Sequence, residues 1–261
     1  MRYACAAQTA TGPREEPEDI MGVCIIVGGG EGLGRSLATT FARSGCDIAL
    51  ISRSEQGSRS AVEAARAARA NAKVAFYAAD ATQPAQLEQA CARIQVEMGK
   101  AEVLIYNARG GFALRPPLEL TYAELEDTFR LEVIGAFAAA KAVMPGMINR
   151  KRGSVLFSSA TAAFRGSGSN AVYAIGKFGL RALAQSLAKA YAKDGVHVAH
   201  VRLDCTLDVP VARKFLGDNV NLETLANTDD VAASYLWIHQ QPKSAWSNEV
   251  ELRPYTENWT Y

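Results

Sequence analysis

The chain has 261 residues, of which 49% are hydrophobic and 21% charged, with a formal net charge of +1. Without a charge block, nucleic acid and anionic membranes are poor partners, and no uninterrupted apolar run reaches the roughly 18 residues of a membrane span. The five cysteines form no CxxC pair, which is typical of free thiols in a reducing compartment. We therefore expect a cytoplasmic protein with neither a disulfide framework nor a metal site.

The first twenty residues, "MRYACAAQTATGPREEPEDI", differ in composition from the rest. They are too acidic for a transit peptide and have no apolar core of the kind that a secretory signal needs. Residues 1–20 are therefore interpreted as a disordered N-terminal extension, and Met21 is a second candidate start. A single domain is expected over residues 21–261.

From Met21 onward, segments with strand and helix patterns alternate. Short β-branched runs predict strands at 22–29, 46–53, 72–80, 101–107, 153–159, 196–204 and 248–254. Helical spacing predicts helices at 32–45, 56–70, 84–99, 122–150, 170–195 and 228–240, the last with Thr228 as N-cap. This alternation predicts an α/β fold: a Rossmann-like, doubly wound parallel sheet of about seven strands with helices on both faces.

The stretch "VGGGEGLGRSLA" joins the first strand to the first helix and contains a GxxxGxG pattern at Gly28, Gly32 and Gly34. Glycine lets the backbone approach a pyrophosphate, and a helix N-terminus offers free N–H donors to it. Read alone, the pattern also fits a tight turn that binds nothing. After the first strand of an alternating chain, it favours a nucleotide site.

The second strand ends with Ser52 and Arg53, where an NAD site usually carries an acid for the ribose 2′-hydroxyl. A guanidinium can pair with a 2′-phosphate, so this end favours NADP(H) over NAD(H). Arg53 could equally be a solvated loop residue. Glu31 in the glycine turn argues the other way, because NADP-binding chains often have a basic residue there.

Five motifs in this order resemble those of the short-chain dehydrogenase/reductase family, over nearly all of residues 21–261. They are "VGGGEGLG", "AAD" at 78–80, "YNA" at 106–108, "SS" at 158–159 and "YAIGK" at 173–177. The resemblance implies an oxidoreductase that interconverts a carbonyl and an alcohol with a nicotinamide cofactor. It also implies a homodimer or homotetramer joined through two long helices.

The resemblance assigns roles to residues of this chain. Ser159, Tyr173 and Lys177 would be catalytic: Tyr173 as general acid/base, Lys177 as the cation that lowers its pKa and holds the ribose, and Ser159 as donor to the substrate oxygen. Ser158 is the fallback serine, although neighbours in a strand face opposite ways. The implied cofactor-binding residues are Gly28, Gly32, Leu33, Gly34, Ser52, Arg53, Asp80, Asn107, Ala108, Tyr173 and Lys177. Of these, Asp80 would bind the adenine.

Several positions depart from the family pattern. Val27 replaces a threonine before the glycines, and Tyr106 and Arg109 flank Asn107–Ala108 in place of Asn and Gly. An asparagine of the long helix aligns with Glu132, whose carboxylate could pair with Lys177 and compete for its charge.

The loop after the sixth strand departs too: Asp204–Cys205 stands for Pro-Gly and Val209 for a threonine. We therefore expect a divergent member. The leading interpretation is an active carbonyl reductase or alcohol dehydrogenase, and the alternative is a catalytically weak NADP(H)-binding regulator or redox sensor.

The substrate pocket is expected where strands four to six end. Apolar side chains there indicate a small, partly apolar substrate: Phe112, Leu114, Phe164 and Leu207. Arginines that could meet an acidic group are Arg109, Arg115 and Arg165. His197 and His200, three apart in a strand, face opposite ways and are interpreted as structural. Cys205 is expected to be a buried, inert thiol. Trp246 and Trp259 are expected at a subunit contact.

Overall fold

The computed structural model describes residues 22–110, 114–217 and 220–257. The expected disordered extension at residues 1–20, the pocket residue Phe112 and the contact residue Trp259 lie outside the described residues.

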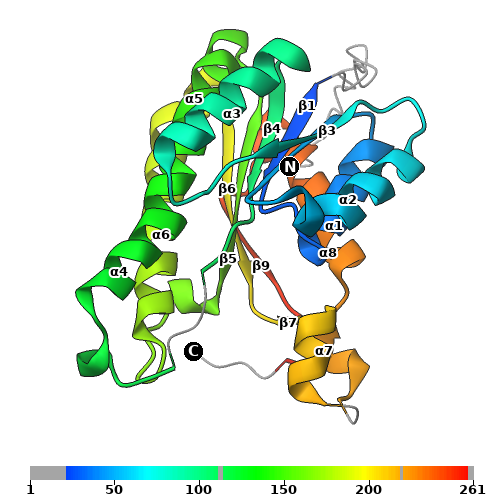
Figure 1. Cartoon of the computed structure of the whole chain (residues 1–261). Helices are drawn as coiled ribbons and strands as arrows, with labels where there is room; N and C mark the ends of the chain where they lie inside the picture. The colour runs from blue at the N-terminus through cyan, green and yellow to red at the C-terminus, as the bar shows by residue number, and fades with distance from the viewer. Residues whose placement is uncertain (1–21, 111–113, 218–219, 258–261) are drawn as a thin grey trace, which may run out of the picture.

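The core of the protein is a seven-stranded sheet with the order β3-β2-β1-β4-β5-β6-β9 (Figure 1). Every neighbouring pair in it is parallel. Its strands are β1 (Val23–Val27), β2 (Asp47–Ser52), β3 (Val74–Ala78), β4 (Ala101–Tyr106), β5 (Ser154–Ala160), β6 (His197–Leu203) and β9 (Glu249–Leu252). The predicted doubly wound sheet is confirmed, and its strand order reverses between β1 and β4, where such folds bind ligands.

Helices cover both faces of the sheet (Figure 1). One face carries α3 (Pro84–Glu97), α5 (Ala136–Arg150) and α6 (Ala171–Tyr191), which share one apolar core cluster. The other carries α1 (Leu33–Arg43), α2 (Glu55–Ala68) and α8 (Thr228–His239), which share a second cluster. Because the sheet is covered on both sides, all five residues of β1 are buried, as expected for its unbroken apolar run.

The predicted long helix is an uninterrupted helical run with an irregular middle. It consists of α4 (Tyr122–Phe129), a π-helical segment (Arg130–Gly135) and α5. A capping box starts it, in which Thr121 Oγ1 accepts from Glu124 N at 3.2 Å. By length and mean hydropathy this run of 29 residues could cross a membrane, although 50% of its most apolar window is buried inside the fold. The apolar side chains of this run are buried in the way expected for a helix that packs on a sheet.

Two details at the C-terminal end of the chain differ from expectation. Asn227, not Thr228, caps α8, because its Oδ1 accepts from Asp229 N at 2.8 Å and Thr228 is already helical. The region after β6 also contains more structure than a loop. It holds α7 (Pro210–Leu216) and a small separate sheet of β7 (Thr206–Leu207) and β8 (Leu225–Ala226).

Candidate functional site

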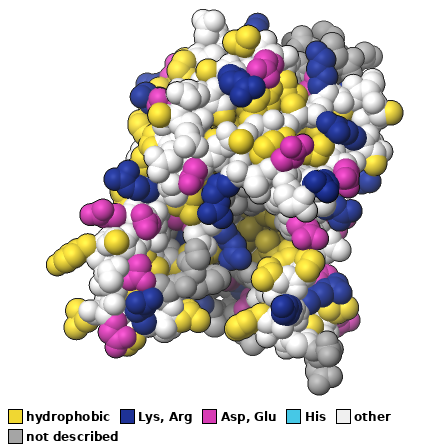
Figure 2. Space-filling model, in the orientation of Figure 1, with side chains coloured by type: hydrophobic (Ala, Val, Ile, Leu, Met, Phe, Trp, Pro, Cys, Tyr) yellow, Lys and Arg dark blue, Asp and Glu magenta, His cyan; other side chains and the backbone are white. Residues whose placement is uncertain are grey.

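The predicted site residues gather at the edge where the parallel strands end. The glycine turn follows β1, Asn107 follows β4, and Ser159 lies near the end of β5. In Figure 1 these strands end between α4 and α6 on one side and α7 on the other. Figure 2 shows the surface hollowed at this level, with Lys or Arg side chains beside the hollow. A ligand at this edge would lie at the reversal of strand order.

The start of the glycine turn is held against the end of β4. Gly28 has a φ of +92°, and a Cβ on it would lie 2.6 Å from Ala108 N. Asn107 Nδ2 donates to Gly28 O at 3.1 Å. Both the positive φ and the close approach require glycine at this position. Asn107 and Ala108 therefore lie beside the turn, as the sequence predicts.

The first turn of α1 is open to an anion. Its N-cap, Gly32, offers no side-chain acceptor to the first amides of the helix. The Leu33 side chain is buried in the core, so only its backbone N–H could face a phosphate. A Cβ on Gly34 would lie 2.6 Å from Gly28 O, and a Cβ on Gly32 would lie 2.8 Å from Val209 Cγ1. These backbone donors fit a pyrophosphate group.

The ends of β2 and β3 place the remaining predicted cofactor residues. Ser52 Oγ bonds Ser54 O at 3.0 Å and Ser58 Oγ at 2.8 Å, so this hydroxyl already stabilises its own turn. Arg53 is exposed beside it. After β3, Asp80 Oδ1 accepts from Thr82 N at 2.9 Å and from Thr82 Oγ1 at 2.8 Å. The Asp80 carboxylate is thus fixed in orientation at the same edge.

The two serines of β5 face opposite sides of the sheet. Ser158 Oγ accepts a hydrogen bond from the buried Tyr235 hydroxyl of α8 at 2.8 Å. Alternate residues of a strand point to the same face, so Ser159 lies on the same side of the sheet as Val155 and Phe157, which pack in the core beneath α6. Its Oγ is buried and has no hydrogen-bond partner within the described part of the chain. The geometry therefore favours Ser159 over the fallback Ser158.

Tyr173 and Lys177 lie one turn apart on α6, and Lys177 Nζ is 5.7 Å from the centre of the Tyr173 ring. Lys177 lowers the pKa of Tyr173, as expected, but the net shift is upward and not toward neutrality. Burial raises the pKa of Tyr173 above its ordinary value, and Glu132 raises it further, whereas Lys177 and Arg109 lower it. The phenol is therefore protonated at neutral pH.

The charge of Lys177 is neutralised locally. Its Nζ lies 2.8 Å from Glu132 Oε2 and donates to Ser158 O at 3.2 Å. Only 3% of the Lys177 side chain and none of the Glu132 side chain is exposed. The pairing of Glu132 with Lys177, expected from the sequence, is confirmed.

Other departures from the family pattern make specific contacts. The Tyr106 hydroxyl donates to Leu131 O in the π-helical segment. Asp204 contacts Thr161 Oγ1 and forms an ion pair with Arg253. These side chains therefore link the loops around the site.

Cys205 is only partly buried, whereas the sequence predicts a buried thiol. Burial raises its pKa to about 12, so it stays protonated at neutral pH.

Sequence reasoning missed an arginine beside the serine. Arg202 of β6 is the register partner of Ser159. Its guanidinium lies 3.9 Å from the centre of the Phe164 ring, and that of Arg181 lies 3.6 Å from the same ring. Arg202 also pairs with Glu251 of β9. No pattern in the sequence indicates this arrangement, because it depends on the pairing register of three strands.

The expected substrate-facing residues are distributed unevenly. Leu114 is largely exposed, while Phe164 is half-covered by the two guanidiniums. Arg115 Nη2 pairs with Glu124 of α4 at 2.8 Å, so it already has a carboxylate partner within the chain. Arg109 is exposed at the end of β4, close enough to Tyr173 to lower its pKa.

His197 and Trp246 contact each other, whereas the buried His200 has no hydrogen-bond partner among the described residues. His197 stacks on Trp246 with ring centres 4.7 Å apart, and Trp246 Nε1 donates to Gln241 O at 3.1 Å. Trp246 thus packs within its own chain but stays partly exposed, so its place at a subunit contact stays a prediction. His200 faces the α6 side, where burial lowers its pKa to about 4. Among the described residues, His, Cys, Asp and Glu form no cluster that could hold a metal ion.

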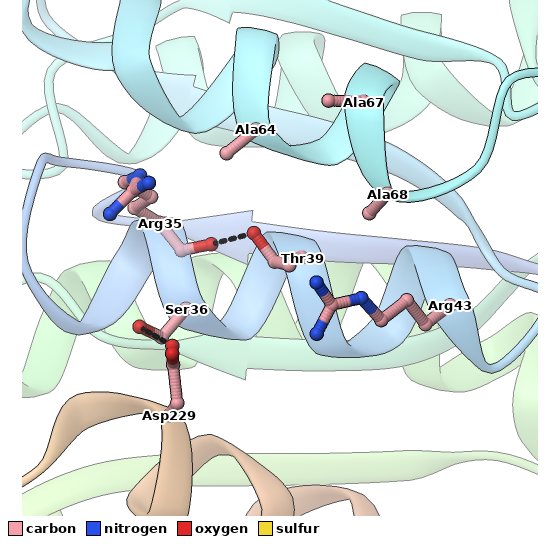
Figure 3. A pocket seen from close by; sticks show the side chains of 8 residues that line it. All are labelled: Arg35, Ser36, Thr39, Arg43, Ala64, Ala67, Ala68 and Asp229. Carbon is pink, nitrogen blue, oxygen red and sulfur yellow. Dashed lines mark hydrogen bonds between the residues drawn. The ribbon is translucent and has the colours of Figure 1, made fainter.

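A second concave place lies away from these residues, between α1, α2 and the start of α8 (Figure 3). Arg35, Thr39 and Arg43 of α1 face three alanines of α2 there. Ser36 Oγ donates to Asp229 Oδ1 at 2.5 Å and joins α1 to α8. None of the eight lining residues is a predicted site residue, so this pocket is separate from the strand-end site.

Comparison with known proteins agrees with this geometry. A family model described as short chain dehydrogenase matches residues 22–215. The human 3-oxoacyl-[acyl-carrier-protein] reductase is 25% identical over 228 residues, which cover 84% of this chain and 92% of the human protein. Oxidoreductase UcpA from Escherichia coli (strain K12) is 32% identical over 176 residues, 67% of this chain and 65% of UcpA.

A solved structure shares the fold. The alcohol dehydrogenase from the archaeon Thermococcus sibiricus, complexed with 5-hydroxy-NADP, superposes with a TM-score of 0.81 at 20% sequence identity. The superposition covers 92% of this chain and 100% of the archaeal chain.

Proposed function

The chain belongs to the short-chain dehydrogenase family of oxidoreductases. From that premise we propose that it uses NADP(H) to reduce a carbonyl group on a small, partly apolar substrate, or to oxidise the corresponding alcohol. The observation that carries the proposal is the placement of Tyr173 and Lys177 on α6 against the end of β5, at the edge where the glycine turn opens. The glycine turn and the acid/base pair would thus serve one site at this edge.

In the proposed reaction each catalytic residue has one task. Tyr173 gives its phenolic proton to the substrate oxygen during reduction and takes it back during oxidation. Ser159, whose Oγ is otherwise unpaired within the described residues, donates a hydrogen bond to the same oxygen. Lys177 keeps one N–H free beyond its bonds to Glu132 and Ser158, and this donor would orient the ribose. A bound reduced nicotinamide would supply the hydride.

The preference for NADP(H) over NAD(H) is part of the proposal. Arg53 is exposed at the end of β2, and the neighbouring position that often holds a 2′-hydroxyl acceptor carries Ser52. A guanidinium at this position can pair with the charged 2′-phosphate of NADP(H), whereas the neutral 2′-hydroxyl of NAD(H) gains little from it. The complex of the archaeal alcohol dehydrogenase with 5-hydroxy-NADP supports this choice. The cofactor residues proposed are those predicted from the sequence.

The names of the relatives indicate the reacting group of the substrate. The human relative is a 3-oxoacyl reductase and the archaeal structure is an alcohol dehydrogenase, so both names refer to carbonyl or alcohol chemistry. In this chain, Leu114 and Phe164, two of the apolar residues expected at the pocket, are exposed, and Arg109 adds a cation near Tyr173. We propose a substrate with an apolar part and a reducible carbonyl.

Titration of the purified protein with NADPH and with NADH, read by nicotinamide fluorescence, tests the cofactor part of the proposal. We expect NADPH to bind more tightly. A preference for NADH would remove Arg53 as the selector, and no binding of either would contradict the oxidoreductase proposal. With binding established, a panel of carbonyl compounds and NADPH would identify turnover.

A second candidate is a catalytically weak NADP(H)-binding regulator on the same fold. The buried pair of Glu132 and Lys177 favours it, because the pair occupies the cation that the relay uses. The unpaired Ser159 favours the enzyme, since a protein that only binds the cofactor does not need this hydroxyl. Binding of NADPH without turnover on a broad carbonyl panel would support the regulator.

We further propose that residues 21–261 form one cytoplasmic catalytic domain that assembles as a homodimer or homotetramer. The helical run α4–α5 and helix α6 would form the contact. Phe129, Phe137 and Phe178 on these helices are each at least 42% exposed, which supports an apolar interface there. Light scattering would measure the assembly, and a monomer at all concentrations would contradict it.

A further inference from the structure

Three positions that depart from the family pattern belong to one cluster. Tyr106 at the end of β4 donates to Leu131 O, next to Glu132. Glu132 Oε1 accepts from Gly110 N at 3.0 Å, beside Arg109. Glu132 therefore connects the loop after β4 with Lys177 on α6.

The backbone around Glu132 is shaped to admit its side chain. The π-helical segment Arg130–Gly135 carries it into the interior, and such segments often occur at functional sites. A Cβ on Gly176 would lie 2.9 Å from Glu132 Cγ and 2.7 Å from Thr128 Cγ2. The glycine of the "YAIGK" stretch thus leaves room for Glu132 to reach Lys177.

Both partners of the ion pair make further hydrogen bonds within the chain. Of the three protons on Lys177 Nζ, one goes to Glu132 Oε2 and one to Ser158 O. The two oxygens of Glu132 accept from Lys177 and from Gly110 N. A buried ion pair is weak evidence for stability, because desolvation opposes its Coulomb attraction. This pair therefore calls for a role other than holding the fold together.

The charged groups around Tyr173 come from three elements. Lys177 lies on its own helix, Glu132 on the π-helical segment and Arg109 on the loop after β4. Two more titratable groups face the pair, Tyr106 beside Glu132 and His200 beside Lys177. Burial raises the pKa of Tyr106 well above its ordinary value and lowers that of His200 to about 4, so both are neutral at neutral pH.

We propose that Glu132 is a positioning residue for the proton relay: it holds Lys177 as half of a neutral ion pair and thereby opposes the ionisation of Tyr173 that the Lys177 ammonium by itself would favour. This inference rests on the proposed function, in which Tyr173 is the acid. The proton-donating form is the one that carbonyl reduction uses. Alcohol oxidation uses the phenolate, so its rate in this protein should rise only at alkaline pH.

Removing the negative charge reverses the effect. In Glu132→Gln, Lys177 is no longer neutralised, and an uncompensated ammonium near a phenol favours the phenolate. The pKa of Tyr173 should therefore fall, by about one unit or more. The rise of the oxidation rate with pH should move toward neutral pH by the same amount, and reduction should begin to decline at a lower pH.

The decisive experiment does not need a substrate. Tyrosines labelled with ¹³C at Cζ report phenol ionisation by NMR, and a Tyr173→Phe variant identifies the Tyr173 resonance. The titration is run from neutral pH up to the limit at which circular dichroism still shows the folded protein. We expect the resonance to titrate at lower pH in Glu132→Gln than in the wild type. Glu126→Gln removes the same charge from an exposed position of α4 and should leave the midpoint unchanged.

A double variant keeps the test decisive if Glu132→Gln does not fold. Glu132→Gln with Lys177→Met removes both charges, and replacing both partners of a buried pair is often tolerated. Because Lys177 acts on Tyr173 more strongly than Glu132 does, the Tyr173 midpoint should rise in this variant, but less than in Lys177→Met alone. A midpoint in the double variant no lower than in Lys177→Met, or an unmoved one in a folded Glu132→Gln, would overturn the proposal. A shift without any turnover would support Glu132 and contradict the reductase proposal instead.

Discussion

The glycine turn and the cluster around Lys177 lie at the same edge of the sheet, but they are made of different parts. The turn is built from backbone: a positive φ at Gly28, a close approach to Ala108 and the uncapped first turn of α1. The Lys177 cluster is built from charged side chains, with the buried Glu132 in ion-pair contact and the exposed Arg109 near Tyr173. A backbone site keeps its geometry when surrounding side chains change, whereas a charge cluster is retuned by one substitution.

The largest expected effect lies in the charge cluster. Tyr173→Phe removes the only proton that the tyrosine could transfer, so turnover should fall by about 10²–10⁴-fold, far more than NADPH affinity does. Steady-state rates and fluorescence titration measure the two effects separately. Tyr122→Phe is a matched control, because that tyrosine is 87% exposed on α4. Unchanged turnover in Tyr173→Phe would exclude it as the acid.

The two serines of β5 should separate catalysis from stability. Ser159→Ala should lower turnover by about 10²-fold, since it removes a donor to the substrate oxygen. Ser158→Ala leaves the buried Tyr235 hydroxyl without its acceptor and should lower the free energy of unfolding by about 1–3 kcal/mol with little effect on turnover. Denaturant unfolding and steady-state rates test both. The reverse outcome would make Ser158 the catalytic serine.

Within the glycine turn, Gly28→Ala should damage the backbone site directly. A side chain at φ +92° is strained and would meet Ala108 N, so we expect a loss of about 1–3 kcal/mol in stability together with weaker NADPH binding. Gly168→Ala is the control, because a Cβ there meets no atom within 4 Å. Equal melting temperatures for the two variants would show that the turn tolerates a side chain.

The smallest effect concerns the choice of cofactor. Arg53→Ala should weaken NADPH binding by about 10–100-fold, the loss expected for a charged hydrogen bond, and leave NADH unaffected. Arg59→Ala removes the same charge from an exposed position of α2 and should change neither affinity. If NADPH and NADH affinities fall together in Arg53→Ala, the guanidinium contacts a part of the cofactor common to both.

Much of the fold was accessible from local pattern. Alternating apolar strands and amphipathic helices require a covered parallel sheet, because both faces of such strands must be buried. The ends of the long helix were predicted from the sequence, but its π-helical middle was not. No residue type marks the place where the backbone hydrogen bonds change from i→i+4 to i→i+5. The capping of α8 by Asn227 instead of Thr228 is a shift of one residue between two adjacent polar caps.

The sequence by itself determined the sheet, the position of the glycine turn and the spacing of Tyr173 and Lys177, because each depends on residues close together in the chain. Only the tertiary structure decided the state of the charges: that Glu132 is fully buried against Lys177, that Arg202 stands beside Ser159, and that burial raises the pKa of Tyr173. Desolvation and charge–charge interaction depend on distance and burial among residues far apart in sequence. Those quantities come into existence only when the strands and helices pack.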